Sequence, residues 1–440
     1  MTRDEILSTV KNEKIEVVRL WFTDILGMLK GFSLRVEDLP RALDEGIGFD
    51  GSSVEGFVRI EESDLLAFPD TDTFILLPEE FGGVRTAVMI CDILYPDGEH
   101  FESDPRFVLR NMLEQAKSQG FEHFYVGPEL EYFYFPSEKE PIPLDSGGYF
   151  DILPLNKSAH TRKETFITLR ELGIELEVSH HEVAKSQHEL DFRYDDALNI
   201  ADTIQIAKVI VKEVARKNGL YASFMPKPVF GENGSGFHIH QSLFTDSENA
   251  FYDKNDPYNL SDIAKHYIAG LLKHSEEITA ITNQWVNSYK RLVPGYEAPA
   301  YISWGRKNRS ALVRVPAFKP HRWKSCRVEY RAPDPACNQY LVFAVMLAAG
   351  LDGIQQKYPL TKPIELDIYT MHPDEREKHG IKSLPDSLFS AVQKMEHSEL
   401  VRKTLGDTLF TKYIANKKAE WERYRVQVTD YELREYLPTL

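Results

Sequence analysis

Cysteines are few in this chain, and none is placed to form a structural zinc site. The sequence holds three cysteines in 440 residues, Cys91, Cys326 and Cys337, and no CxxC pair. The spacing therefore argues against zinc-binding modules. So low a cysteine content fits the reducing cytoplasm, where we expect the protein to work.

Long apolar runs and an excess of positive charge are also missing. The longest apolar run, 340–351, is too short to span a bilayer, and the first residues lack the apolar core of a signal peptide. The formal net charge of −16 argues against nonspecific binding to nucleic acid or to anionic membranes. Neither a Walker A sequence nor a GxSxG motif occurs, which excludes P-loop and α/β-hydrolase interpretations.

Length and composition predict two globular domains. A chain of 440 residues exceeds one average domain, and a hydrophobic content of 42% allows a sizeable core. Thr2 and Glu5 have the spacing of a capping box, which predicts a short first helix. Strand-like runs follow at 17–22, 28–34, 73–77 and 86–93.

A domain boundary is expected near residue 103. Residues 95–98 read Tyr-Pro-Asp-Gly, which is typical of a turn, and the Asp-Pro pair at 104–105 then supplies a cap and a first-turn proline for a helix. The Asp-Pro pair at 334–335 predicts another such start before the apolar helix at 340–351.

A glycine-rich bend that leads into a polar strand is the most informative segment. Residues 233–240 read Asn-Gly-Ser-Gly-Phe-His-Ile-His, and the period of a strand puts His238, His240 and Ser242 on one face. The glycines let the backbone approach a ligand closely, and the amide of Asn233 can bind a polar substrate.

Four further strand-like segments carry polar residues on one face. Glu129 and Glu131 would lie roughly 7 Å apart on one of them, with a repulsion on the order of 2 kcal/mol that a cation or solvent must relieve. A solvated outer face would explain any one such strand, whereas five together favour a sheet with a charged, funnel-shaped concave face. Carboxylates with an occasional imidazole favour Mg²⁺ or Mn²⁺ over zinc. The other segments contribute Glu182; Gln187, Glu189, Asp191 and Arg193; and Glu329 between Arg327 and Arg331.

Cationic residues complete the polar set. Arginines bind carboxylate and phosphate oxygens, often with two hydrogen bonds at once, so beside a divalent cation they predict a phosphate or carboxylate substrate. Surface ion pairs would explain each arginine alone. The residues concerned are Lys290 and Arg291, which share the Pro- and Gly-punctuated loop 287–299 with Glu297, then Arg309 and Arg314.

Several long motifs, taken in order, resemble those of glutamine synthetase, type I. They are Phe-Asp-Gly-Ser-Ser at 49–53, Asn-Gly-Ser-Gly-Phe-His at 233–238, the loop 287–299, and Arg-Val-Glu-Tyr-Arg at 327–331. The resemblance runs from Val17 to the C-terminus, and the short loops are similar to the alpha subtype of bacterial and archaeal enzymes. It implies an ATP-dependent ligase that phosphorylates glutamate to γ-glutamyl phosphate, which ammonia converts to glutamine.

The resemblance also implies roles for particular residues. Two or three cations, Mg²⁺ or Mn²⁺, would be held by Glu131, Glu182 and Glu189, and by Glu129, His238 and Glu329. The glutamate substrate would be bound by Asn233, Gly234, Arg291, Glu297, Arg309 and Arg331. ATP would lie near Glu177, Tyr194, His240, Ser242, Arg314 and Lys324. Three residues would be catalytic, with Asp50 taking a proton from ammonium, Arg309 holding the transferred phosphate and Glu297 closing the site.

The implied fold is α+β. An N-terminal β-grasp domain, 1–103, would precede a larger catalytic domain, 104–440, in which helices back a curved antiparallel sheet. The resemblance further implies a homo-oligomer, a dodecamer of two stacked hexameric rings with active sites between subunits, and regulatory proteins as further partners. Thr429 and Glu432 cap a last apolar segment, which we expect to be a partner surface.

Regulation is expected to act through glutamine. Tyr369 lies in Asp-Ile-Tyr-Thr-Met, unlike the Asn-Leu-Tyr-Asp-Leu context of adenylylated relatives, so we predict no adenylylation. Arg59 matches a position linked to feedback inhibition by glutamine in the alpha subtype.

Two other functions are compatible with these residues. One is a related ligase that joins glutamate to a larger amine, and the other is a glutamine-sensing regulatory protein without catalysis. The intact set of metal-ligand positions argues against the second.

Overall fold

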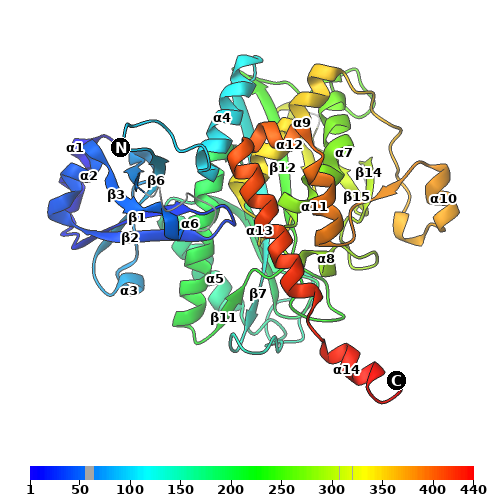
Figure 1. The fold of residues 1–440 in the computed structure, drawn as a ribbon, viewed down its shortest axis with the longest axis horizontal. Helices are drawn as coiled ribbons and strands as arrows, with labels where there is room; N and C mark the ends of the chain where they lie inside the picture. Colours follow the sequence, from blue (N-terminus) through cyan, green and yellow to red (C-terminus); the bar gives the residue numbers. More distant parts are fainter. Residues whose placement is uncertain (55–63, 307, 320) are drawn as a thin grey trace.

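The computed structural model describes residues 1–54, 64–306, 308–319 and 321–440. Arg59 lies outside these residues. Two sheets organise the chain, one in a smaller N-terminal part and one in a larger part that runs to the C-terminus (Figure 1). The described residues contain no helix that is both long and apolar enough to cross a membrane.

The N-terminal sheet has the strand order β2-β1-β6-β4-β3, with β5 beside β6. The β1 and β6 strands run parallel and the other pairs are antiparallel. Its helix α1 begins with the expected capping box of Thr2 and Glu5. The elements are α1 (Arg3–Asn12), β1 (Val17–Thr23), β2 (Leu29–Arg35), α2 (Leu39–Glu45), β3 (Ile47–Asp50), β4 (Asp64–Pro69), β5 (Ile75–Leu76), α3 (Glu79–Gly82) and β6 (Thr86–Leu94).

The larger sheet has the order β17-β14-β15-β16-β12-β7-β9-β8. It is antiparallel except for the β14–β15 pair, and β10 and β11 extend along β7. All five strand-like polar segments belong to it, as expected. The strands are β7 (His123–Phe135), β8 (Leu176–His181), β9 (Gln187–Phe192), β10 (Asp195–Asp196), β11 (Tyr221–Ser223), β12 (Phe237–Thr245), β13 (Glu248–Asn249), β14 (Tyr301–Gly305), β15 (Ala311–Arg314), β16 (Val328–Tyr330) and β17 (Lys382–Ser383).

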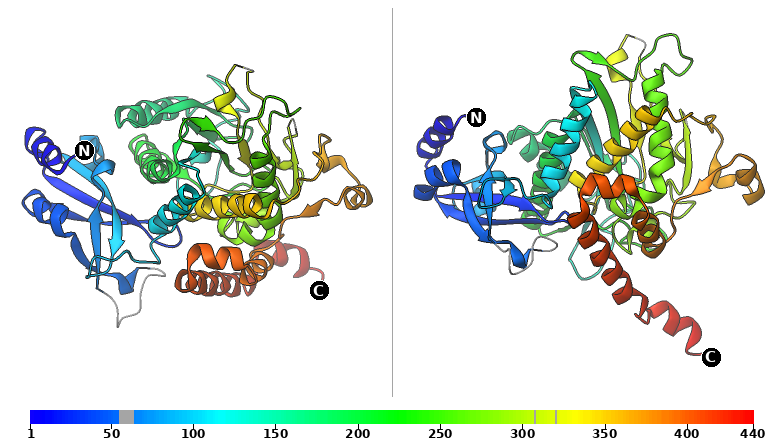
Figure 2. Two further views of the ribbon diagram at one scale, coloured as in Figure 1. Left: turned by 90° about the horizontal axis from the view of Figure 1, so that it is seen from above. Right: turned by 45° about the horizontal axis from the view of Figure 1, so that its top comes forward.

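Helices cover the outer side of this sheet (Figures 1 and 2). The apolar helix α9 is almost wholly buried between the sheet and its neighbours. The helices are α4 (Pro105–Ser118), α5 (Ala159–Glu171), α6 (Ala197–Lys217), α7 (Asp262–Thr282), α8 (Ser288–Arg291), α9 (Gln339–Gln356), α10 (Pro373–Lys378), α11 (Leu388–Glu396), α12 (Glu399–Leu405), α13 (Asp407–Arg425) and α14 (Asp430–Tyr436).

One expected helix start is wrong. The Asp-Pro pair at 104–105 begins α4 as predicted, with the Asp104 side chain accepting from the N–H of Arg106. The Asp-Pro pair at 334–335 instead forms a turn, and α9 is capped by Asn338. The Asp334 carboxylate accepts hydrogen bonds from Asn283 and from the N–H of Ala336 within the turn. The helix begins later because the Asn338 side chain accepts from the N–H groups of Tyr340 and Leu341.

Buried polar contacts fix the N-terminal part to the rest of the chain. Arg106 of α4 is 3% exposed and pairs with Asp70 at 2.6 Å and with Asp202 of α6 at 2.8 Å. The turn after β1 is held by Gln284, which donates to the Leu26 carbonyl at 2.8 Å, and by Asn338, which donates to that of Asp24 at 3.1 Å.

The C-terminal helix α14 projects from the body (Figures 1 and 2). The capping box of Thr429 and Glu432 begins it, as expected. Several apolar side chains in this helix and directly after it are exposed, namely Tyr431, Leu433, Tyr436 and Leu437.

Candidate active site

Strand register brings the polar faces together. In the β12–β7 pair His238 lies opposite Glu129, and in the β7–β9 pair Glu131 lies opposite Glu189. On the far side of β12, His240 lies opposite Glu329 of β16. Because alternate residues of a strand share a face, this register gathers carboxylates and imidazoles from four strands on one side of the sheet.

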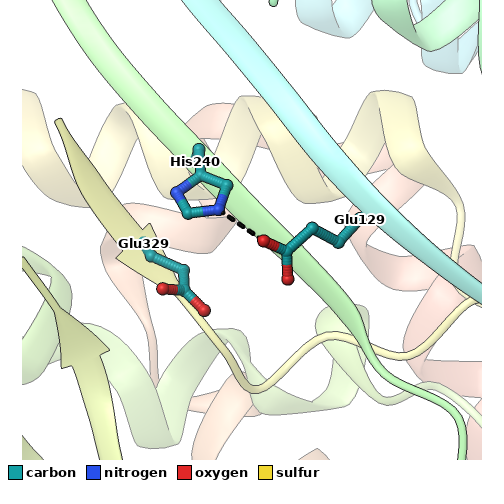
Figure 3. A group of neighbouring side chains, drawn as sticks. All are labelled: Glu129, His240 and Glu329. Carbon is teal, nitrogen blue, oxygen red and sulfur yellow. Dashed lines mark hydrogen bonds and ion pairs between the residues drawn. The ribbon is translucent and has the colours of Figure 1, made fainter. Parts of the chain in front are cut away.

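Glu129, His240 and Glu329 form one group of converging side chains (Figure 3). The Glu129 carboxylate lies 2.8 Å from His240 Nε2 and 2.9 Å from His238 Nδ1. Although burial opposes it, hydrogen bonds from the two histidines hold the pKa of Glu129 well below its usual range. His238, which we expected as a ligand here, lies at the edge of the group, 4.0 Å from Glu329.

Glu329 is fully buried between two arginines. Arg331 donates to one of its oxygens at 2.6 Å, and Arg314 donates to the other. Burial alone would raise the pKa of Glu329, but the charges of Arg331, His240 and Arg314 outweigh it and lower the pKa to about 2. Arg314 was expected beside ATP, and here it holds this carboxylate.

A second group forms around the hairpin of β8 and β9. It consists of His180, Glu189 and Asp191, of which only Glu189 was expected as a ligand. Glu182 lies close by, with one oxygen 3.7 Å from His180 Nδ1 and the other accepting from the N–H of Val183 at 2.8 Å.

Glu131 links the second group to the glycine-rich bend. One of its oxygens accepts hydrogen bonds from the Gln187 amide at 2.9 Å and from the N–H of Gly236 at 2.8 Å. A Cβ atom at Gly236 would lie 2.8 Å from His238 Nε2 and 3.0 Å from Glu131 Oε1. A larger residue at position 236 would therefore displace these side chains from their present positions.

The carboxylates fall into two sets. In the compensated set, neighbouring arginines or histidines balance the negative charge, and in the uncompensated set they do not. Glu129 and Glu329 have cationic or imidazole neighbours, as above. Burial, with the charge of Glu182, raises the pKa of Glu131 to about 8, and burial also raises the pKa of Asp191 to about 6 and that of Glu189. Buried oxygen donors that repel one another are a fitting donor set for hard divalent cations such as Mg²⁺ or Mn²⁺.

A cavity of about 460 Å³ opens beside the first group. Its wall includes Glu129 together with Arg327, Phe318 and Arg322. Five of the six residues expected near ATP line it, Arg314 being the exception: Glu177, Tyr194, His240, Ser242 and Lys324.

A second, smaller cavity of about 40 Å³ lies on the other side of the carboxylates. Arg291 is buried in its wall, where its guanidinium donates to the carbonyls of Ala332 at 2.6 Å and Arg331 at 3.2 Å. Five of the residues expected to bind glutamate line it, along with Glu131, Glu182 and His238: Asn233, Gly234, Arg291, Glu297 and Arg331.

Arg309 and Asp50 lie outside both cavity walls as far as the described residues define them. Arg309 is exposed. Burial raises the pKa of the Tyr149 hydroxyl, and the charge of Arg309 acts in the opposite direction. The Tyr149 ring packs against His180, with ring centroids 5.3 Å apart. Asp50 is exposed at the end of β3. This strand belongs to the N-terminal part (Figure 1). Its carboxylate accepts from the hydroxyl of Ser52 at 2.6 Å and from its N–H at 2.8 Å, and these bonds lower the pKa of Asp50.

Three residues join the site through contacts that no single strand specifies, although Asp191 and Gln187 were already expected on a polar face. His180 and Asp191 join it because β8 and β9 pair beside β7, which no local pattern specifies. Gln187 was placed on the polar face, but its contact with Glu131 and with the Gly234 carbonyl at 3.1 Å depends on the fold.

Comparison with known proteins finds two family models along the chain. The glutamine synthetase β-grasp domain matches residues 14–96, and the glutamine synthetase catalytic domain matches residues 102–436. The expected α+β fold with an N-terminal β-grasp domain is thereby confirmed.

Named relatives and solved structures match over the full length. Glutamine synthetase from Thermotoga maritima is 48% identical, with 99% of this chain and 100% of the relative aligned. Glutamine synthetase from Thermus thermophilus is also 48% identical, with 100% and 99% aligned. Among solved structures, Plasmodium falciparum glutamine synthetase has a TM-score of 0.89 at 26% identity, covering 99% of both chains. A GmaS/ADP complex has a TM-score of 0.89 at 31% identity, covering 98% of this chain and 99% of the other.

Proposed function

The chain belongs to the glutamine synthetase family and is a glutamate–ammonia ligase, and we propose how its two cavities divide the reaction. ATP occupies the larger cavity and glutamate the smaller one. One observation carries this proposal: Glu129 and Glu131 are neighbours on one face of β7, yet Glu129 lines the larger cavity and Glu131 the smaller. The γ-phosphate of ATP and the γ-carboxylate of glutamate would therefore meet over this strand.

The carboxylate groups between the cavities are proposed to hold two to three divalent cations, Mg²⁺ or Mn²⁺. Glu129, His238 and Glu329, with His240 beside them, would hold one, and Glu131, Glu182 and Glu189 another. When bound, such cations neutralise the phosphate oxygens and make the γ-phosphoryl group more electrophilic. Support comes from the uncompensated buried charge described above.

The remaining residues position the substrates and move the proton. Arg331 and Asn233 would bind the glutamate, while Arg291 supports Arg331 through its carbonyl. Arg309 would stabilise charge on the transferred phosphoryl group. Glu297 would cover the smaller cavity, which keeps water from the acyl phosphate. Asp50, whose low pKa keeps it ionised, would accept a proton from ammonium.

We also propose the alpha subtype, with a domain boundary at 103/104 and a dodecamer whose active sites lie between subunits. The exposed apolar side chains of α14 support ring-to-ring docking. Asp50 lies at the end of β3 in the N-terminal part and outside both cavity walls, which supports a site completed by a neighbouring chain. Feedback by glutamine through Arg59 stays a prediction.

A comparison of amines tests the proposed substrate. Purified protein is supplied with glutamate, ATP, Mg²⁺ and either ammonium, methylamine, ethylamine or putrescine, and the amide product is identified by mass spectrometry. We expect kcat/KM for ammonium to exceed that for methylamine by at least about 10-fold, since each extra methyl group must be fitted into the site. A preference for a larger amine would support the related ligase instead. Glutamine binding without phosphate release would support the regulatory protein.

A further inference from the structure

The loop 292–300 over the smaller cavity contains a residue in an unusual conformation. Glu297 has φ of +57°, in the left-handed region that non-glycine residues rarely adopt. Its side chain lines the cavity and accepts a weak hydrogen bond from Asn233 at 3.5 Å. A residue held in this conformation needs contacts on either side that offset its cost.

The residue after Glu297 is held by a tyrosine from a distant segment. The Tyr369 hydroxyl donates to the carbonyl of Ala298 at 2.6 Å, and the same carbonyl accepts from the N–H of Ala300 at 2.9 Å. Tyr369 belongs to a short 3-10 helix, Ile368–Thr370, which is 71 residues away along the chain. Ala298 is buried at this contact.

The residue before Glu297, Tyr296, contacts a different segment of the chain. The ammonium of Lys227 lies 3.9 Å from the centroid of the Tyr296 ring, a close cation–π contact. The backbone of Lys227 is itself fixed by Asn287, whose side chain accepts from its N–H at 2.8 Å. Glu297 thus lies between two neighbours that are tied to separate parts of the chain.

The surroundings of Tyr369 keep its hydroxyl protonated and therefore able to donate. Burial raises its pKa to about 12 although the charges of Arg331 and Arg291 act in the opposite direction. Ala298, to whose carbonyl the hydroxyl donates, lines the smaller cavity together with these two arginines.

We propose that Tyr369 and Lys227 form a two-point latch that positions Glu297 and holds loop 292–300 closed over the acyl phosphate. Tyr369 is a positioning residue, since it acts through Ala298 and Glu297. The inference rests on the proposed function of the smaller cavity. When ammonia attacks the γ-carbon, the C–N bond forms, the C–O bond to phosphate breaks, phosphate leaves and the nitrogen loses a proton to give glutamine. When water attacks instead, glutamate and phosphate form and ATP is consumed without an amide. An open latch therefore lowers the glutamine formed per ATP cleaved.

The test compares Tyr369→Phe with Tyr358→Phe. Both tyrosines are half-buried, both have a pKa raised to about 12, and each hydroxyl makes one hydrogen bond, that of Tyr358 to Asp352 at 2.9 Å. Tyr358 does not line either of the two cavities. Two quantities are measured, the ratio of glutamine formed to ATP cleaved and the hydrogen–deuterium exchange of residues 293–300.

Tyr369→Phe is expected to lower the ratio and to speed exchange in the loop about fivefold, the effect of one lost hydrogen bond. Lys227→Met is expected to act in the same direction, and Tyr358→Phe is expected to change neither quantity. A Tyr369→Phe protein with the wild-type ratio and unchanged loop exchange would overturn the latch, even if its overall rate fell. If the wild-type protein formed no glutamine, the proposed function would fail, while the exchange comparison would still decide whether Tyr369 holds the loop.

Discussion

Glu329→Gln should destabilise the metal-free protein by about 3 kcal/mol, as expected for breaking a buried ion pair. Glu131→Gln should leave the metal-free protein equally stable or make it more stable. Glu329 compensates two arginines, Arg314 and Arg331, so its loss leaves buried positive charge without a partner. Glu131, when ionised, would instead add negative charge to a place where burial and the charge of Glu182 disfavour it, as its raised pKa indicates.

The pH dependence should distinguish the two variants further. The pKa of Glu131 is about 8 in the folded protein, above its ordinary value of 4.5, because burial and the charge of Glu182 disfavour ionisation. Between these two values the folded state binds the proton more tightly than the unfolded state does. Stability of the metal-free protein should therefore fall as pH rises through this window, and Glu131→Gln should reduce that fall.

Thermal unfolding in EDTA from pH 5 to pH 8.5 measures both effects. Both variants should bind divalent cations at least about 100-fold more weakly than the wild type, because each loses a ligand oxygen charge. Equal destabilisation by the two substitutions would contradict the division into compensated and uncompensated carboxylates. Full activity of Glu329→Gln at ordinary Mg²⁺ concentrations would remove Glu329 from the metal site.

Mixing two inactive variants, Asp50→Ala and Arg309→Ala, should restore activity. Each variant alone should lose at least about 100-fold in kcat, the usual contribution of a proton acceptor or of a group that stabilises transition-state charge. If Asp50 of one chain completes the site of its neighbour, about a quarter of the sites in a randomly mixed 1:1 ring would combine an intact Asp50 with an intact Arg309. The mixture should then reach about a quarter of wild-type activity.

A second mixture provides the matched control. Arg309→Ala and Glu329→Gln both alter the larger part of the chain, so no site assembled from these two variants escapes both defects. Subunit exchange is verified by native mass spectrometry of differently tagged chains. Recovery in the control mixture, or no recovery with Asp50→Ala despite proven exchange, would refute a site shared in this way.

Local periodicity was enough to predict which residues share a strand face. The alternation of Glu129 with Glu131, and of His238 with His240, follows from the pleat alone and holds in β7 and β12. Capping patterns at Thr2, Asp104 and Thr429 were also sufficient, because the partners lie within the next turn.

Contacts between segments far apart in the sequence determined the features that local patterns did not predict. Asp334 looked like a helix cap but is engaged by Asn283, from a segment 51 residues earlier. His180 joined the carboxylate-rich face of the sheet through the pairing of β8 with β9, and Tyr369 reached the loop of Glu297 from another part of the chain. Such partners depend on tertiary packing, which no pattern within one strand or turn encodes.

Transfer of oxygen from glutamate to phosphate tests the proposed chemistry most directly. Glutamate labelled with ¹⁸O in its γ-carboxylate is incubated with the purified protein, ATP, Mg²⁺ and ammonium, and the inorganic phosphate is analysed by mass spectrometry. If the γ-carboxylate attacks the γ-phosphorus of ATP and ammonia then displaces the phosphate, each phosphate released carries one oxygen atom from glutamate. Glutamine formation accompanied by unlabelled phosphate would contradict the γ-glutamyl phosphate route and the assignment of the two cavities to ATP and glutamate.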